Sequence, residues 1–139
     1  MTIEEWFSWF SKKETEATDG LQAGDFSQWY RLAEDICRPL RPYVLTALIY
    51  ENLVYNLAAH LVIMDSETEQ PPLSTLWGKY KVADYGGFIS SASNDKTSAG
   101  YAVPKTFSEG DLSDWLYAAT PYGRKYLSWV EQIKPLAVN

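Results

Sequence analysis

His60 is the only histidine of the chain and lies within a long apolar stretch. An imidazole can act as a general base, because its ordinary pKa of about 6.5 lies close to neutrality. Asn52 and Asn56 precede it at a spacing of four residues, which is typical of one line of side chains along a helix. This line resembles helix–helix hydrogen bonding rather than a catalytic triad. We therefore expect Asn52, Asn56 and His60 to lie at a helix–helix or intersubunit seam.

The acidic residues Asp65, Glu67 and Glu69 alternate along the chain as calcium ligands do in some binding loops. The run lacks the glycine turn and the closing glutamate of an EF-hand loop, and Pro71 and Pro72 interrupt it. We interpret the run as a solvated loop and expect no metal site there.

Other short patterns fall short of a catalytic or cofactor motif. Four serines between residues 90 and 98 lack the Gly-x-Ser-x-Gly elbow of a hydrolase. Gly86 and Gly87 are not followed by the Gly-Lys-Ser/Thr of a phosphate-binding loop. The basic pair Arg124 and Lys125 fits a solvated face, with an acidic partner or a phosphate as the alternatives. We expect no catalytic residue, cofactor or metal, and therefore no enzyme.

The composition fits one globular domain over residues 1–139. Twelve basic and 18 acidic residues leave a net charge of -6, which argues against tight nucleic-acid binding through a basic surface. Aromatic residues make up 15% of the chain, so some are expected to lie against partners. The single cysteine, Cys37, excludes an internal disulfide and a cysteine-based zinc site, and it fits a reducing compartment.

The acidic residues near the N-terminus do not resemble a secretory signal. The longest apolar stretch, residues 43–64, carries Glu51 beside the polar line that ends at His60. A membrane span tolerates few such groups. We interpret the stretch as a buried helix of a globular protein and expect no membrane partner.

Capping and periodicity place the helices. Thr2 and Glu5 fit a capping box for a first helix. A second helix is expected from near Asp25 to the residues before Pro39, which gives an N-terminal helical part over residues 2–38. Leucines at a spacing of four residues predict a long core helix over residues 43–64. The expected apolar stripe of the second helix consists of Trp29, Leu32, Ala33 and Ile36.

The C-terminal half combines a predicted hairpin with a helix. Small and β-compatible residues flank Asn94 and Asp95, which predicts a β-hairpin over residues 88–103. A short turn of helix is possible near Leu76. Thr120 as N-cap predicts a helix over residues 120–134, closed by Pro135, and a tail over residues 135–139. The expected fold is mainly α: a small helical bundle around one long apolar helix, with an inserted β-hairpin.

Three sequence blocks occur in the order that a family of small tailed-phage proteins shows. They are Gly-Phe-Ile-Ser-Ser-Ala-Ser (residues 87–93), Ser-Ala-Gly-Tyr-Ala-Val-Pro (98–104) and Ala-Thr-Pro-Tyr-Gly-Arg-Lys-Tyr-Leu (119–127). The long helix also ends in the run Ala-Ala-His-Leu (58–61). On these blocks the chain resembles head–tail connector proteins, also called adaptor or head completion proteins. The pattern covers residues 43–130, whereas the Trp-rich residues 1–40 match only in outline and the acidic loop at 65–72 is atypical.

The resemblance implies a structural protein of the virion neck, made in the host cytoplasm. Such adaptors form a ring, usually twelvefold, under the portal protein. The ring extends the channel through which genomic DNA passes and presents a surface to the next stopper or tail protein. A ring needs two unlike lateral faces, and extra Trp and Tyr residues suit such contacts. In related adaptors the C-terminal segment docks on the portal, which here implies docking by Trp129, Ile133, Pro135, Leu136, Ala137, Val138 and Asn139.

The hairpin is expected to contact a neighbouring subunit or the channel. We expect this contact to involve Phe88, Ile89, Asn94, Asp95, Tyr101 and Val103. The alternatives are an ordinary surface ribbon for the hairpin and a frayed end for the tail. For the whole chain, the alternatives are another neck component, such as a stopper or tail terminator, and a small helical regulatory protein.

Overall fold

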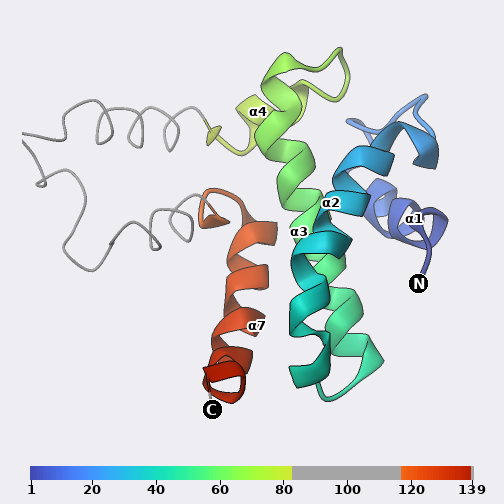
Figure 1. The fold of residues 1–139 in the computed structure, drawn as a ribbon. Helices are drawn as coiled ribbons and strands as arrows, with labels where there is room; N and C mark the ends of the chain where they lie inside the picture. Colours follow the sequence, from blue (N-terminus) through green and yellow to red (C-terminus); the bar gives the residue numbers. More distant parts are fainter. Residues whose placement is uncertain (83–116, 139) are drawn as a thin grey trace, which may run out of the picture.

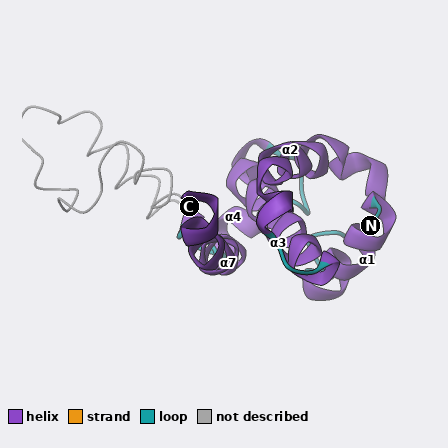
Figure 2. Cartoon of the chain, turned by 60° about the horizontal axis from the view of Figure 1, so that its bottom comes forward, coloured by secondary structure: helices purple, strands orange, loops and turns teal. Residues whose placement is uncertain are grey.

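The structure of this chain is a computed structural model that describes residues 1–82 and 117–138. All regular elements in these residues are helical, which confirms the prediction of a mainly α fold (Figure 2). The longest of them, α3 (Ala47–Asp65), packs against α2 (Ser27–Cys37) and against α7 (Pro121–Val138). Figure 1 shows α2 and α7 running antiparallel to α3. The described part is therefore a bundle around one long apolar helix. The hairpin predicted over residues 88–103 lies outside the described residues.

The first helix, α1 (Ile3–Lys13), begins where its capping residues predict. The Thr2 hydroxyl oxygen accepts the backbone N–H of Glu5 at 3.2 Å, as a capping box requires. The Glu5 carboxylate accepts the Thr2 hydroxyl proton, at 3.1 Å, instead of the expected backbone N–H of Thr2. A short 3-10 helix, η1 (Ala23–Phe26), then leads into α2, which ends before Pro39 as predicted.

The long helix begins later than the leucine spacing predicts. Residues 38–43 form a 3-10 helix, η2 (Arg38–Tyr43), and Val44 is extended. Thr46 is also extended, and its side chain accepts the N–H of Ile49 at 3.2 Å. This cap starts α3 at Ala47 rather than at residue 43. Leu45, which the periodicity places on the helix, therefore lies before it and is 85% exposed.

The last helix begins at Pro121, as predicted, but it continues past Pro135 to Val138. No tail separates from the helix over residues 135–138. A proline inside a helix removes one N–H donor and crowds the preceding turn, but its fixed φ is itself helical. Near the end of a helix only a little pairing is lost, so Pro135 does not end α7.

The segment that follows α3, up to residue 82, contains two short helices. The acidic run predicted as a solvated loop contains η3 (Ser66–Thr68), whose Glu67 and Thr68 are exposed. The possible short helix near Leu76 is present as α4 (Thr75–Lys79).

Aromatic side chains make up much of the core. Trp6, Phe10 and Phe26 are fully buried, and the rings of Trp6 and Phe10 stack with centroids 5.0 Å apart. The indole N–H of Trp6 donates to the Tyr55 carbonyl at 3.1 Å, which joins α1 to α3. The indole N–H of Trp29 donates to Asp65 at 2.7 Å and joins α2 to the end of α3. Much of the high aromatic content therefore serves the interior of the chain itself.

One described helix is long and apolar enough to cross a membrane. This helix is α3 with its continuation η3 (Ala47–Thr68), and 61% of its most apolar window is buried inside the protein. The core helix of a globular protein passes the same test, and α3 packs as a core helix does.

Candidate functional site

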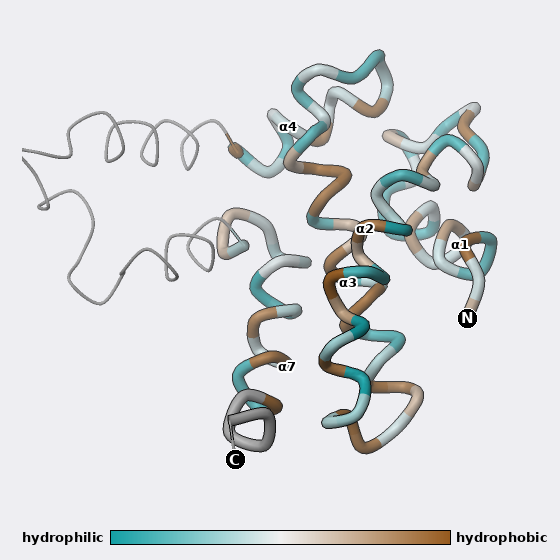
Figure 3. Tube along the Cα trace, in the orientation of Figure 1, coloured by the Kyte–Doolittle hydropathy of each residue, from teal (hydrophilic) through white to brown (hydrophobic). Residues whose placement is uncertain are grey.

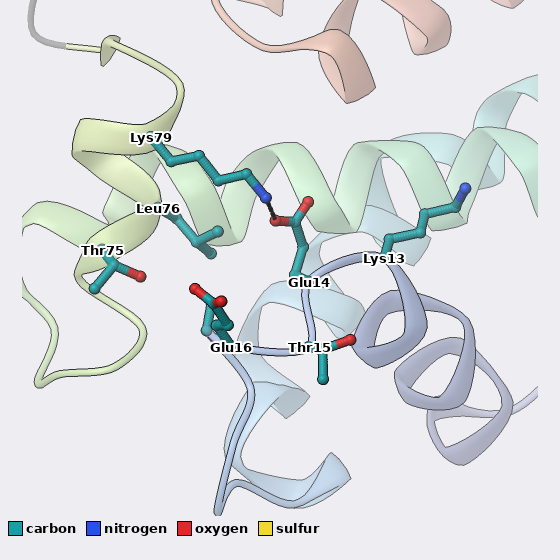
Figure 4. Close-up of a pocket in the computed structure, with 8 residues that line it drawn as sticks. Lys13, Glu14, Thr15, Glu16, Thr75, Leu76 and Lys79 are labelled. Atoms are coloured by element: carbon teal, nitrogen blue, oxygen red, sulfur yellow. Dashed lines mark hydrogen bonds and ion pairs between the residues drawn. The ribbon is translucent and has the colours of Figure 1, made fainter.

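Glu14 is a buried carboxylate just after α1, with 3% of its surface exposed. Lys79 donates to its Oε1 at 2.6 Å, and Tyr122 donates to its Oε2 at 2.6 Å. The Tyr80 hydroxyl also donates to Oε2. Figure 4 shows the Lys79 side chain reaching from α4 to this carboxylate. We call these four residues the Glu14 cluster.

The backbone around Glu14 holds the carboxylate in place. Its N–H donates to the Phe10 carbonyl at 2.8 Å, which continues the hydrogen bonding of α1 by one residue. Its carbonyl accepts both the N–H of Thr18, at 3.1 Å, and the Thr18 hydroxyl, at 2.9 Å. A buried charge is costly unless it is paired and hydrogen-bonded, and Glu14 meets both conditions.

The cluster keeps its donors protonated. Burial, and then the hydrogen bond to Glu14, raise the pKa of the Tyr80 and Tyr122 phenols above the usual 10.0. The hydrogen bond to Glu14 likewise raises the pKa of the Lys79 ammonium. The three donors stay protonated near neutral pH, and the cluster joins the residue after α1 to α4 and to the start of α7.

Two clefts border Glu14. One, of about 300 Å³, lies between the residues that follow α1 and the helix α4 (Figure 4). The other, of about 410 Å³, lies between α1, α3, α4 and the start of α7, and we call it the lysine cleft. The residues that line the lysine cleft are Trp9, Lys13, Glu14, Asn52, Asn56, Lys79, Tyr80, Pro121, Tyr122 and Lys125.

His60 joins α3 to the start of α7. Its Nδ1 lies 2.7 Å from the Thr120 hydroxyl oxygen, which also accepts the N–H of Gly123 at 2.9 Å. The ring of Tyr117 packs edge-on to the imidazole, with centroids 5.3 Å apart. His60 is 2% exposed, and burial lowers the pKa of its imidazole to about 4. The imidazole is therefore neutral near pH 7, and it packs between α3 and the start of α7.

Asn52 and Asn56 differ from His60 in their partners. The side-chain amide of Asn52 donates to the Leu48 carbonyl at 3.0 Å, and that of Asn56 donates to the Asn52 carbonyl at 2.8 Å. Both bonds lie within α3, so neither forms the predicted hydrogen bond between helices. Both side chains instead line the lysine cleft.

One end of the molecule exposes apolar side chains. Leu45 is 85% exposed and Leu48 is 67% exposed, and both lie near the start of α3. Tyr43, at the end of η2, is 39% exposed. Figure 3 shows hydrophobic colour at this turn into α3, and η2, which precedes the turn, packs against α7. A hollow of about 90 Å³ lies between the residues that precede α3 and helix α7, and Trp129 of α7 lines it. We call Tyr43, Leu45, Leu48 and Trp129 the apolar end.

The residues expected to dock on a portal occupy different environments. Trp129 is half-buried at the apolar end, whereas Ile133 is buried in the core. Pro135, Leu136, Ala137 and Val138 are helical positions of α7, and Asn139 lies outside the described residues. The residues assigned to the hairpin contact also lie outside the described residues: Phe88, Ile89, Asn94, Asp95, Tyr101 and Val103.

Sequence reasoning missed the Glu14 cluster. Glu14 belongs to a charged connector between two helices, where a carboxylate is ordinarily solvated. Nothing in its neighbourhood marks it as buried, since its donors come from residues 79, 80 and 122. The one available signal is indirect: Tyr122 belongs to the Thr-Pro-Tyr-Gly motif at the start of α7.

The described residues contain no group of three or more His, Cys, Asp or Glu side chains that could hold a metal ion. Comparisons of the chain with family models, with curated proteins and with solved structures find no match.

Proposed function

We propose that this chain is a structural protein of the tailed-phage neck, a ring-forming head–tail adaptor that binds under the portal. In this role it extends the DNA channel and offers a docking surface to the next neck or tail protein. The ring consists of copies of this chain, and DNA passes through its lumen without sequence-specific binding. The order of the sequence blocks at residues 58–61, 87–93, 98–104 and 119–127 is the basis of the proposal.

The observation that carries the proposal furthest is the contact between two of these blocks. His60 of the first block lies against Thr120 of the last, 60 residues away, and Gly123 completes the contact. There is no room for a larger residue at position 123, because an added Cβ would lie 1.8 Å from the Tyr117 carbonyl oxygen. The two motifs thus depend on each other physically, as parts of one shared fold do. This mutual dependence supports the resemblance on which the proposal rests.

The apolar end supports the assembly part of the proposal. Exposed leucines on a small domain favour contact with a partner. We assign this end, together with the C-terminal part of α7, to the portal contact, and the hairpin over residues 88–103 to a neighbouring subunit or the channel. Ile133 is 5% exposed and lines the hollow beside Trp129, so we keep it in the proposed contact as a residue that shapes this hollow.

Native mass spectrometry tests the proposal. The purified chain is measured alone and after mixing with the portal ring of the phage that encodes it. We expect a complex with one copy of this chain per portal subunit. A chain that ignores the portal ring but binds a tail or stopper protein would instead assign it to another position in the neck.

A further inference from the structure

The lysine cleft has the opposite charge to the molecule as a whole. The chain carries 18 acidic and 12 basic residues, yet Lys13, Lys79 and Lys125 all line this cleft, with Glu14 as its one carboxylate. Lys79 is paired with Glu14. Within the part of the chain that the structure describes, neither Lys13 nor Lys125 has an ion pair. Two cations of the cleft are therefore available to an anionic ligand.

The lining of the cleft includes buried polar side chains. Glu14 is 3% exposed, Asn56 is 2% exposed and Tyr122 is 9% exposed. A helical bundle ordinarily covers its core with apolar side chains, because a buried polar group costs free energy unless it is hydrogen-bonded. This polar lining favours a ligand that forms hydrogen bonds over an apolar one.

The two asparagines determine which hydrogen-bonding groups the cleft offers. Each side-chain nitrogen donates to a carbonyl of α3, and only the NH₂ group of an amide can do so. The orientation of both amides follows, and among the residues that the structure describes neither Oδ1 atom has a hydrogen-bond donor, so both remain as acceptors. The cleft therefore combines two unpaired cations with two amide acceptors, Asn52 and Asn56.

A ligand that matches this combination carries both negative charges and N–H donors. An acidic peptide segment has both, in its carboxylates and its backbone amides. A nucleic-acid backbone has the negative charges but no N–H donor, so it would leave both amide acceptors without a partner. We propose that the lysine cleft binds an acidic segment of a partner protein. This inference does not rest on the proposed neck function, since it follows from the cleft alone.

Each part of the cleft has a role in this proposal. Lys13 and Lys125 pair with carboxylates of the segment, and Asn52 and Asn56 accept its backbone N–H groups. Trp9 supplies a flat wall, and the Lys13 ammonium already lies 5.2 Å from the centroid of its ring. The Glu14 cluster fixes α4 and α7 on either side, so the cleft is formed before the ligand arrives.

Titration of the ¹⁵N-labelled full-length chain with an alternating Glu–Gly dodecapeptide, followed by NMR, tests the proposal. The expected shifts are confined to Lys13, Lys125, Tyr122 and the side-chain amides of Asn52 and Asn56. An alternating Gln–Gly peptide is expected to cause no comparable shifts. Binding of the acidic peptide is expected to weaken as salt is added, because exposed ion pairs are screened.

Charge reversal at Lys13 and Lys125 distinguishes binding in the lysine cleft from a general attraction of the acidic peptide to surface lysines. The double variant Lys13→Glu with Lys125→Glu should weaken peptide binding by about tenfold or more. Lys12→Glu is the control for charge reversal outside the cleft: Lys12 is an exposed lysine on the same helix that does not line the cleft, and the effect of this change should stay within about twofold. All three side chains are exposed, so the fold should persist, and thermal unfolding of each variant checks this.

Three results would overturn the proposal. The first is the absence of shifts at the cleft up to millimolar acidic peptide. The second is an equal loss of binding in the Lys12→Glu control. The third is tighter binding of a thymidine dodecanucleotide than of the peptide at the same residues, which would make the cleft a phosphate site.

Discussion

Gly123 is the one described glycine whose position has no space for a Cβ atom. Gly123 is the third residue of α7, where an added Cβ would meet the Tyr117 carbonyl oxygen at 1.8 Å and His60 Nδ1 at 2.6 Å. Gly78 in α4 has nothing within 4 Å of the same position. The φ angle of neither residue demands glycine, so the difference between them is space alone.

Replacing Gly123 by alanine is therefore expected to destabilise the protein. The methyl group would lie 1.8 Å from a backbone carbonyl oxygen and would force backbone atoms apart, which costs about 3 kcal/mol, the upper end of the usual range. This cost outweighs the gain in helix propensity of about 1 kcal/mol. Gly78→Ala should be neutral or slightly stabilising, because only the propensity term acts there. Urea unfolding of both variants measures the difference. Equal stabilities would show that the start of α7 relaxes without cost.

At the scale of elements, the contact between α3 and α7 depends on the neutral imidazole of His60. The pKa of His60 is about 4 in the folded chain, against an ordinary value of 6.5, because the ring is buried. As the pH falls below 6.5 the unfolded chain takes up a proton that the folded chain does not. The free energy of unfolding therefore falls between pH 6.5 and about 4, and is unaffected by this group above pH 6.5.

This pH dependence can be isolated with His60→Gln. The variant lacks the titrating group, whereas the carboxylates that titrate in the same range are common to both proteins. The difference in free energy of unfolding between wild type and variant should shrink by up to about 1.4 kcal/mol per pH unit below pH 6.5. Urea unfolding at pH 7 and at pH 5 measures it. A difference that stays constant with pH would mean that His60 titrates normally in the folded chain.

Glu14 joins three elements in the same way: the end of α1, helix α4 and the start of α7. Glu14→Gln keeps the shape but replaces one acceptor oxygen by a donor, so a buried tyrosine hydroxyl or Lys79 loses its partner. The expected loss is about 1–3 kcal/mol of stability. Glu16→Gln, at an exposed position of the same connector, should change stability by less than about 0.5 kcal/mol. Similar effects from both variants would contradict the structural role of the cluster.

For the molecule as a whole, the apolar end is the feature that its own fold does not explain. Leu45 and Leu48 contribute little to the core at 85% and 67% exposure. Under the proposed function, the double variant Leu45→Asp with Leu48→Asp should leave stability within about 1 kcal/mol of wild type and abolish the complex with the portal.

The control for this variant is Leu32→Asp. Leu32 belongs to the apolar stripe predicted for α2, but it is 48% exposed and does not line the hollow at the apolar end. Native mass spectrometry should find the portal complex intact in this control. Retention of the complex in the double variant would remove the apolar end from the portal contact.

The sequence by itself determined the features that depend on neighbouring residues. The mainly α class, the Thr2 cap of α1, the end of α2 before Pro39 and the start of α7 after Thr120 all follow from local spacing and capping. These features involve side chains within one or two turns of one another, so a single stretch of sequence contains the whole interaction.

Only the tertiary structure decided the features that join distant segments. The donors to Glu14 lie 65, 66 and 108 residues away in the sequence, and no local pattern records such contacts. The same holds for the lysine cleft, whose cations come from three helices or their ends, and for the lack of space at Gly123. The Thr46 cap, and not the spacing of the leucines, decides where α3 begins. The hydrogen bond at the helix end outweighs the apolar periodicity, which would have extended the helix by one further turn. Burial and pairing depend on which surfaces meet, and that is a property of the packed chain.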